Sequence, residues 1–341
     1  MGDVALGVVL SLIAGIVNGS FAAPTKYSKL WQWENIWAVW AVVALFIVPW
    51  TLGLLTIPHL FSLYEEAELR PLLLLVGFGF GNGLAQICFG LGLAAIGLSL
   101  GFAIAIGIST ALGSLGPLVI LHPELIPTAQ GMTIIGGVVL ILIGIVVCAV
   151  AGRMKEAALR PPGASQASRS GVGSWQKFIY SICAGILSPA ANFAVAFGGP
   201  LVAQAADHGA QEMFKAGVLW PPFLLATMVP YLAYCAHLWR KNDSFKLYSL
   251  AGTRHYWLFG LLMGLLWTGS LYMFGASATY MSTLGPILGW PLFMSSIIIT
   301  SNVWGFATGE WKGAGNKPVS FMLGGIVFLI LGFVTLAIAS R

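Results

Sequence analysis

Residues 130–151, QGMTIIGGVVLILIGIVVCAVA, form a run of 22 residues without one charged side chain. Hydrocarbon about 30 Å thick is crossed by about 20 helical residues, so this run is long enough to span a bilayer. Backbone polar groups in lipid must be satisfied within the segment, which favours a helix. Nine similar stretches cover most of the remaining chain, near 4–23, 35–57, 71–93, 97–121, 175–197, 213–239, 256–278, 282–308 and 318–339. The sequence therefore predicts an all-α membrane protein with ten transmembrane helices.

The composition excludes several other classes of protein. Hydrophobic residues make up 58% and charged residues 8% of the 341, and mean hydropathy is +0.89, whereas soluble domains carry roughly 25% charged residues. The basic residues are spread along loops, so we expect no nucleic-acid partner despite the net charge of +5. No phosphate-binding loop, zinc motif or nucleophile–base–acid set occurs, so we expect neither an enzyme nor a nucleotide site or cofactor. The four cysteines lie inside predicted helices without metal-ligand spacing and are interpreted as packing residues: Cys88, Cys148, Cys183 and Cys235.

The positive charges alternate between connections. Of the 16 lysine and arginine residues, 13 follow predicted helices one, three, five, seven and nine, and the other three are Arg70, Lys215 and Arg341. By the positive-inside rule, the first set of connections is cytoplasmic and both termini lie on the outer, periplasmic side. Residues 1–3 carry no basic region, so the first helix is expected to be retained as a span.

The chain also divides near its midpoint. Residues 160–171, RPPGASQASRSG, have the composition of a flexible linker. We predict a first five-helix repeat over 1–152, a cytoplasmic linker over 153–174 and a second repeat over 175–341. Residues 11–18, SLIAGIVN, resemble residues 181–188, SICAGILS; chance similarity between Gly- and Ala-rich spans is the alternative. Five helices is an odd number, so the second repeat would be inverted, as in many secondary transporters.

Three further blocks carry a specific resemblance: residues 23–37, APTKYSKLWQWENIW; residues 97–108, GLSLGFAIAIGI; and residues 309–319, GEWKGAGNKPV. Over its whole length the chain resembles the L-rhamnose/proton symporter family of the drug/metabolite transporter superfamily. The resemblance implies two inverted five-helix repeats in a bacterial inner membrane and proton-coupled import of L-rhamnose or a related deoxysugar by alternating access. Three side chains differ from those expected in rhamnose-transporting members of the family: Gln86, Asn18 and Asn192. The resemblance therefore does not identify which sugar is transported. An exporter or facilitator of another small metabolite or drug on the same scaffold is the alternative.

A sugar site in such a protein needs hydrogen-bonding groups for hydroxyls and an aromatic surface for the apolar face of the ring. Amides and aromatics inside the predicted helices supply the candidates: Asn18, Asn82, Gln86, Asn192, Trp267, Tyr272, Trp290 and Asn302. Hydrogen bonding between helices is the alternative role for each amide. Tryptophans at the span ends are interpreted as an interfacial belt: Trp31, Trp33, Trp50, Trp175 and Trp311.

Coupling candidates are few, because no Asp or Glu lies at the centre of a predicted helix. Glu34 lies at the start of helix two near Lys26, and Glu310 follows helix nine. We hypothesise that Glu34 changes protonation during transport, with Lys26 and Glu310 in coupling or gating; an interfacial salt bridge or cap is the alternative. A proton is the expected coupling ion, with sodium not excluded. Further carriers considered are His122, His237, Asp3 and Glu124. The expected partners are a small sugar and the lipid bilayer, and no obligate protein partner is evident.

Overall fold

The computed structural model describes residues 4–159 and 176–340, and these residues form helices and no strands. Ten helical segments in the described part of the chain are long and apolar enough to cross a membrane, as the sequence predicts. They are Val4–Tyr27, Trp33–Thr56, Leu69–Ile96, Leu98–Leu121, Ala129–Ala158, Phe178–Phe197, Lys215–Asn242, Arg254–Tyr280, Ser282–Ala307 and Asn316–Ala339. The chain is thus an all-helical, multi-pass membrane protein.

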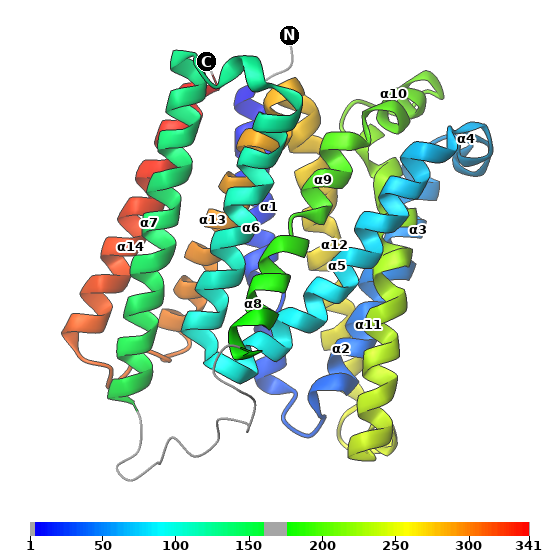
Figure 1. Ribbon diagram of the computed structural model, residues 1–341. Helices are drawn as coiled ribbons and strands as arrows, with labels where there is room; N and C mark the ends of the chain where they lie inside the picture. The colour runs from blue at the N-terminus through cyan, green and yellow to red at the C-terminus, as the bar shows by residue number, and fades with distance from the viewer. Residues whose placement is uncertain (1–3, 160–175, 341) are drawn as a thin grey trace. The chain divides into compact units, whose positions relative to one another are not determined.

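Several spans are built from more than one helical element (Figure 1). The α-helices are α1 (Val4–Ser20), α2 (Trp33–Val42), α3 (Val48–Thr56), α4 (Leu60–Glu66), α5 (Leu69–Ile96), α6 (Leu98–Leu121), α7 (Ala129–Ala158), α8 (Gln176–Leu187), α9 (Ala190–Phe197), α10 (Gly199–Asp207), α11 (Trp220–Asn242), α12 (Arg254–Tyr280), α13 (Gly285–Ala307) and α14 (Asn316–Ala339). Tighter 3-10 turns are η1 (Ala23–Tyr27), η3 (Pro123–Leu125), η4 (Lys215–Leu219), η5 (Phe245–Ser249) and η6 (Ser282–Leu284). A π-helical turn, η2 (Val43–Ile47), joins α2 to α3.

Two details of the span boundaries differ from expectation. The fifth span continues as α7 to Ala158, beyond its expected end at residue 151, so residues expected in the linker are helical. The sixth span is interrupted between α8 and α9 at Pro189, because proline lacks an N–H and clashes with the preceding turn. The predicted linker residues 160–171 lie outside the described part of the chain.

The chain folds into two compact units. The first unit comprises residues 1–84 and 190–285, and the second comprises residues 85–189 and 286–341. Each unit therefore takes segments from both predicted five-helix repeats, and neither repeat is a compact unit by itself.

In the second unit, α7 and α14 run side by side (Figure 1) because small residues face each other along their contact. Gly144 and Gly325 lie at this contact: a Cβ at Gly144 would come within 2.8 Å of Leu329, and one at Gly325 within 2.5 Å of Cys148 Sγ. Gly137 and Gly332 extend the contact in the same way, seven residues from each partner and therefore on the same helix face. Missing side chains let membrane helices approach closely and gain packing contacts.

In the first unit, two helix pairs use the same device. On α12, Gly260 and Gly264 lie against α2 and η2, where added Cβ atoms would meet Val39 Cγ1 at 2.5 Å and Val43 Cγ1 at 2.4 Å. On α5, Gly79 and Gly83 lie against α11, where added Cβ atoms would meet Phe223 O at 2.1 Å and Thr227 O at 2.4 Å. Both pairs have a four-residue spacing, which places the two glycines on one face of the helix.

Candidate functional site

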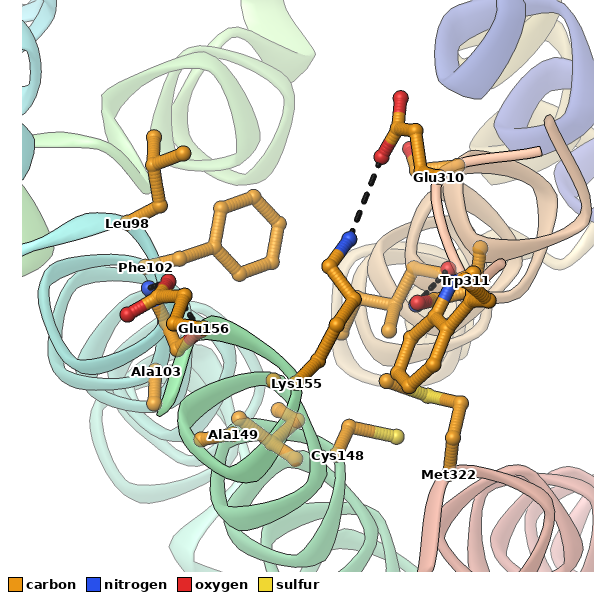
Figure 2. A pocket seen from close by; sticks show the side chains of 16 residues that line it. Leu98, Phe102, Ala103, Cys148, Ala149, Lys155, Glu156, Glu310, Trp311 and Met322 are labelled. Carbon is orange, nitrogen blue, oxygen red and sulfur yellow. Dashed lines mark hydrogen bonds and ion pairs between the residues drawn. The ribbon is translucent and has the colours of Figure 1, made fainter. Parts of the chain in front are cut away.

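The second unit contains a cavity of about 380 Å³ at the ends of α6, α7, α13 and α14. Its volume lies in the range of roughly 300–1,000 Å³ common for small-molecule sites. Figure 2 shows the side chains that line it. The apolar lining includes Leu98, Phe102, Ala103, Ile145, Cys148, Ala149, Gly152, Ile298, Trp311 and Met322, and the polar lining includes Ser99, Ser301, Asn302, Lys155, Glu156 and Glu310.

The cavity extends well into the helical layer. Ile145, near the middle of α7, and Glu156, near its end, both line it. At 1.5 Å of rise per residue these two positions are about 16 Å apart along the helix. Ile298 lines the cavity from the middle of α13. The cavity therefore leads from mid-helix depth to the charged ends of the helices.

Lys155 bridges one side of the cavity. Its Nζ donates to Glu310 Oε2 at 3.3 Å and lies 4.8 Å from the ring centroid of Trp311. Figure 2 shows this side chain reaching from α7 toward the Gly309–Gly315 link between α13 and α14. Positive φ angles at Gly309 (77°) and Gly315 (83°) shape this link, a conformation that glycine adopts at no steric cost. An ammonium between a carboxylate and an indole face is stabilised by both.

Glu156 lines the cavity on the side away from the Lys155–Glu310 pair (Figure 2). Its Oε1 accepts hydrogen bonds from the backbone N of Ser99 at 3.2 Å and from Ser99 Oγ at 2.7 Å. Ser99 lies in the first turn of α6, whose N–H groups have no partner within the helix. A carboxylate in this position is stabilised by those donors and by the helix dipole. A Cβ at Gly152 would meet Ser99 Oγ at 2.4 Å, so this glycine allows the two helices to approach.

The structure brings together two of the sequence-predicted residues in this cavity. Asn302, a predicted sugar ligand, and Glu310, a predicted coupling residue, both line it. Asn302 Nδ2 donates to Ile298 O at 2.9 Å. Trp290 and Gln86 also belong to the second unit but do not line this cavity. Trp290 is 2% exposed and its indole N–H donates to Ser109 O at 3.0 Å, against the glycine surface of Gly113.

The remaining predicted sugar ligands lie in the first unit. Asn18 Nδ2 donates to Ser270 Oγ at 2.8 Å, and Ser270 Oγ donates to Trp267 O at 2.6 Å, so Asn18 and Trp267 meet through one serine. The Trp267 ring lies 5.1 Å from that of Trp40 in a T-shaped pair. These contacts join α1 to α12 in the interior of the unit.

Two of the other three predicted ligands of the first unit form hydrogen bonds to neighbouring helices, and the third is buried. Tyr272 OH donates to Pro49 O at 2.9 Å, and Asn82 Nδ2 lies 3.5 Å from Thr227 Oγ1. Asn192 is fully buried in α9.

Glu34 occupies a buried polar pocket in the first turn of α2. It is 2% exposed, and its Oε1 accepts hydrogen bonds from Asn242 Nδ2 at 2.9 Å and from Ser244 Oγ at 2.5 Å. Among the described residues, no Lys, Arg or His side chain forms an ion pair with it. The hydrogen-bond donors that hold this carboxylate are therefore neutral side chains at the end of α11 and just before η5.

The adjacent backbone is also tied down. Asn35 Nδ2 donates to Ser244 O at 3.0 Å, and Tyr248 OH donates to Asn35 O at 2.9 Å. Burial raises the pKa of Tyr248 above its ordinary value, so this hydroxyl remains a donor at physiological pH. The donors around Glu34 are therefore fixed by contacts between α2, α11 and η5.

Other predicted positions are less enclosed. Lys26 is exposed in η1. Glu124 is exposed in η3, where hydrogen bonds from the backbone and from His122 hold the pKa of its carboxyl below the ordinary value. A carboxyl that favours its charged form is a poor proton carrier near neutral pH. Asp3 lies outside the described residues.

The interpretation of the tryptophans as an interfacial belt is wrong for two of them. Trp31 is 6% exposed, and its indole N–H donates to Leu247 O at 3.0 Å within a ring cluster that includes Tyr248 and Tyr256. Trp311 is 8% exposed and stacks on Phe306. The partner of Trp31 lies 216 positions along the chain, and Lys155 of α7 lies 4.8 Å from the ring centroid of Trp311; a span-end position reveals neither contact.

Sequence reasoning missed Glu156, Lys155 and Phe102 as site residues. The charged residues between 153 and 156 predict the start of a linker by sequence alone, because charge marks the end of a hydrophobic run. Recognition of these residues required knowing that α7 continues to Ala158 and that α6 begins beside it.

Comparison with known proteins places the chain in a family. The profile of the family described as L-rhamnose-proton symport protein (RhaT) matches residues 1–340. The chain is 27% identical over 335 residues to an L-rhamnose-proton symporter of Escherichia coli O9:H4, and 28% identical to one of Citrobacter koseri; each comparison covers 96% of both chains. A solved crystal structure of a protein covers 98% of this chain and 97% of its own, with a TM-score of 0.63 at 13% identity, which shows a shared fold. The chain therefore belongs to the L-rhamnose-proton symport protein (RhaT) family.

Proposed function

We propose that this protein imports L-rhamnose, or a closely related deoxysugar, in symport with protons by alternating access. The observation that carries the proposal is the family match over residues 1–340, in agreement with the names of the relatives. The cavity of the second unit supports it, because apolar walls and charged hydrogen-bonding groups together suit a sugar that has both hydroxyls and a methyl group. Members of this family are transporters, and we propose no enzymatic activity.

An exporter or facilitator of an apolar drug is the second candidate, and the cavity supports it less. Such a substrate favours a wall without costly buried polar groups, whereas Lys155, Glu156 and Asn302 all line the cavity. A neutral sugar, by contrast, can exchange hydrogen bonds with each of them.

We propose that the ten spans form two inverted five-helix repeats. The two glycine contacts of the first unit support this arrangement. The third helix of the first repeat, α5, uses Gly79 and Gly83 against α11, the second helix of the second repeat. Reciprocally, the third helix of the second repeat, α12, uses Gly260 and Gly264 against α2 and η2 of the first. A pseudo-two-fold axis relating the repeats requires contacts in such exchanged pairs.

The bacterial relatives support a location in the inner membrane, and the charge distribution supports an orientation with both termini on the periplasmic side. In this orientation, the Lys155–Glu310 pair and Glu34 lie at the cytoplasmic ends of their helices. We propose that Lys155 and Glu310 close the cytoplasmic mouth of the cavity in one state of the transport cycle and separate in another.

We propose a proton as the coupling ion and Glu34 as its carrier. The descriptions of the family and of its relatives as proton symporters support the proton, and the burial of Glu34 beside Asn242 and Ser244 supports its role. Lys26 is proposed only as a cation near the mouth of this pocket, on its sequence position.

The test is uptake of radiolabelled L-rhamnose into proteoliposomes that contain the protein. An inward proton gradient is expected to drive accumulation above the external concentration, and an inward sodium gradient is not. Unlabelled monosaccharides as competitors rank the substrates. If no sugar is taken up under either gradient, the result would favour the alternative function, an exporter or facilitator of another small molecule.

The amides and aromatics outside the cavity are proposed as residues of the sugar's path, and Asn18 offers a clean case. Asn18→Ala removes the hydrogen bond to Ser270. A ligand role predicts a KM for L-rhamnose raised about tenfold, whereas a purely interhelical role predicts a stability loss of about 1 kcal/mol with the KM unchanged. Uptake kinetics and thermal unfolding of the same preparation separate the two roles.

A further inference from the structure

Lys155 has hydrogen-bonding capacity that its protein contacts do not use. An ammonium has three N–H donors. In the described part of the chain, its acceptor is Glu310 Oε2 at 3.3 Å, and the Trp311 ring lies on another side. The side chain is 21% exposed and lines the cavity. A donor therefore remains for a ligand in the cavity.

Glu156 offers the complementary group. Both hydrogen bonds from Ser99 go to Oε1. Its second oxygen, Oε2, accepts none from the residues that the structure describes. Since Glu156 lines the cavity, the adjacent residues Lys155 and Glu156 present a charged donor and a charged acceptor to the same space.

Two rings of the cavity could cover the apolar face of a pyranose, and the structure favours one of them. Trp311 already stacks on Phe306, with ring centroids 4.9 Å apart, and carries Lys155 at 4.8 Å. Phe102 contacts one other ring, Phe89, at 6.0 Å in a T-shaped pair. At least one face of Phe102 is therefore free of ring neighbours among the described residues, and Figure 2 shows this side chain directed into the cavity.

We propose that the sugar binds in the cavity of the second unit, with Lys155 donating to one hydroxyl, Glu156 accepting from another and Phe102 covering the apolar face. This inference rests on the proposed function and deepens it by naming the residues that recognise the sugar. Sugar hydroxyls both donate and accept, so a donor–acceptor pair on neighbouring residues discriminates between epimers. Asn302 of α13 lines the same cavity.

Variants of the cavity test the assignment by uptake kinetics in proteoliposomes. Lys155→Met and Phe102→Ala should each raise the KM for L-rhamnose about tenfold or more, since each removes one ligand of the sugar. Lys155→Arg keeps a charged donor and should stay within about threefold of wild type. Lys312→Met, in the same link but outside the cavity lining, should leave the KM unchanged. Glu156→Gln keeps an acceptor for Ser99 and removes the charge, so we expect a smaller rise in KM of about threefold.

A second measurement is independent of transport rates. Ala149 lines the cavity, so Ala149→Cys, with the four native cysteines replaced by Ser, places a reporter thiol there. L-rhamnose should slow the reaction of this thiol with a small methanethiosulfonate, which forms a mixed disulfide and releases methanesulfinate, about fivefold or more at saturating sugar. Ser249→Cys, exposed in η5 of the first unit, should react at the same rate with or without sugar.

The outcomes separate this inference from the proposed function. Wild-type uptake together with an unchanged KM in Lys155→Met and Phe102→Ala would overturn the cavity assignment alone. Wild-type uptake without sugar protection at Ala149→Cys would do the same. The double variant Lys155→Met/Glu310→Gln removes both charges of the ion pair. A KM equal to that of wild type in this variant would mean that the unpaired Glu310 carboxylate, and not the loss of a sugar ligand, raised the KM of Lys155→Met. That result would also overturn the cavity assignment. No wild-type uptake of L-rhamnose overturns the proposed function, and this inference with it.

Discussion

Glu34→Gln is expected to abolish proton-driven accumulation of sugar while leaving sugar exchange intact. Gln keeps a side-chain oxygen that can accept from Asn242 Nδ2 and Ser244 Oγ, so the buried pocket between α2, α11 and η5 is preserved. The amide cannot bind and release a proton near neutral pH, so the gradient no longer does work on the sugar. Uptake into proteoliposomes should fall to the level without a gradient, whereas counterflow of labelled sugar should continue.

Glu124→Gln is the matched control, because Glu124 is a 64% exposed carboxylate outside the spans. This variant should accumulate sugar as wild type does. Full proton-driven accumulation by Glu34→Gln would remove Glu34 from the coupling mechanism and direct attention to Glu310. Loss of both accumulation and counterflow would instead indicate that Glu34 is needed for the structure or for sugar binding.

Gly325→Leu is expected to destabilise the second unit by about 3 kcal/mol, at the upper end of overpacking effects. A Cβ here would lie 2.5 Å from Cys148 Sγ and 2.9 Å from the backbone N of Cys148. The backbone of α7 cannot yield as a flexible side chain would, so α14 must separate from α7 and lose packing along their whole contact. Thermal unfolding in detergent or bicelles, followed by circular dichroism, measures the change.

Gly324→Leu provides the control at the neighbouring position. A Cβ at Gly324 would meet no described atom within 4 Å, so the added side chain points away from α7. Its unfolding temperature should stay close to that of wild type. Equal stability of the two variants would contradict the packing of α7 against α14.

The spans themselves could be predicted from the sequence. Apolar runs of about 20 residues have few structural choices in lipid, so residues 130–151 and the other nine stretches predict helices with boundaries near those observed. The end of α7 was placed too early because Arg153, Lys155 and Glu156 are charged, and charge marks the end of a hydrophobic run, whereas a helix continues into water wherever its backbone remains hydrogen-bonded.

The candidate site was only partly predictable. Asn302 and Glu310 were identified from residue type and position, and the structure places both in one cavity. Residue type could not tell that Tyr272 and Trp290 direct their polar atoms at the backbone carbonyls of Pro49 and Ser109. Nor could it tell that Lys155 pairs with a carboxylate 155 positions away.

The sequence by itself determined the environment and the secondary structure of this protein, because hydrophobic length and charge alternation act locally along the chain. It also carried the family resemblance in blocks such as residues 23–37. Tertiary structure alone decided which side chains meet: Glu34 with Ser244, Glu156 with Ser99, and Lys155 with Glu310. These pairs join segments that are distant in sequence, and they form because glycine contacts let particular helices pack closely. The residue pattern of one helix does not specify which other helices pack against it.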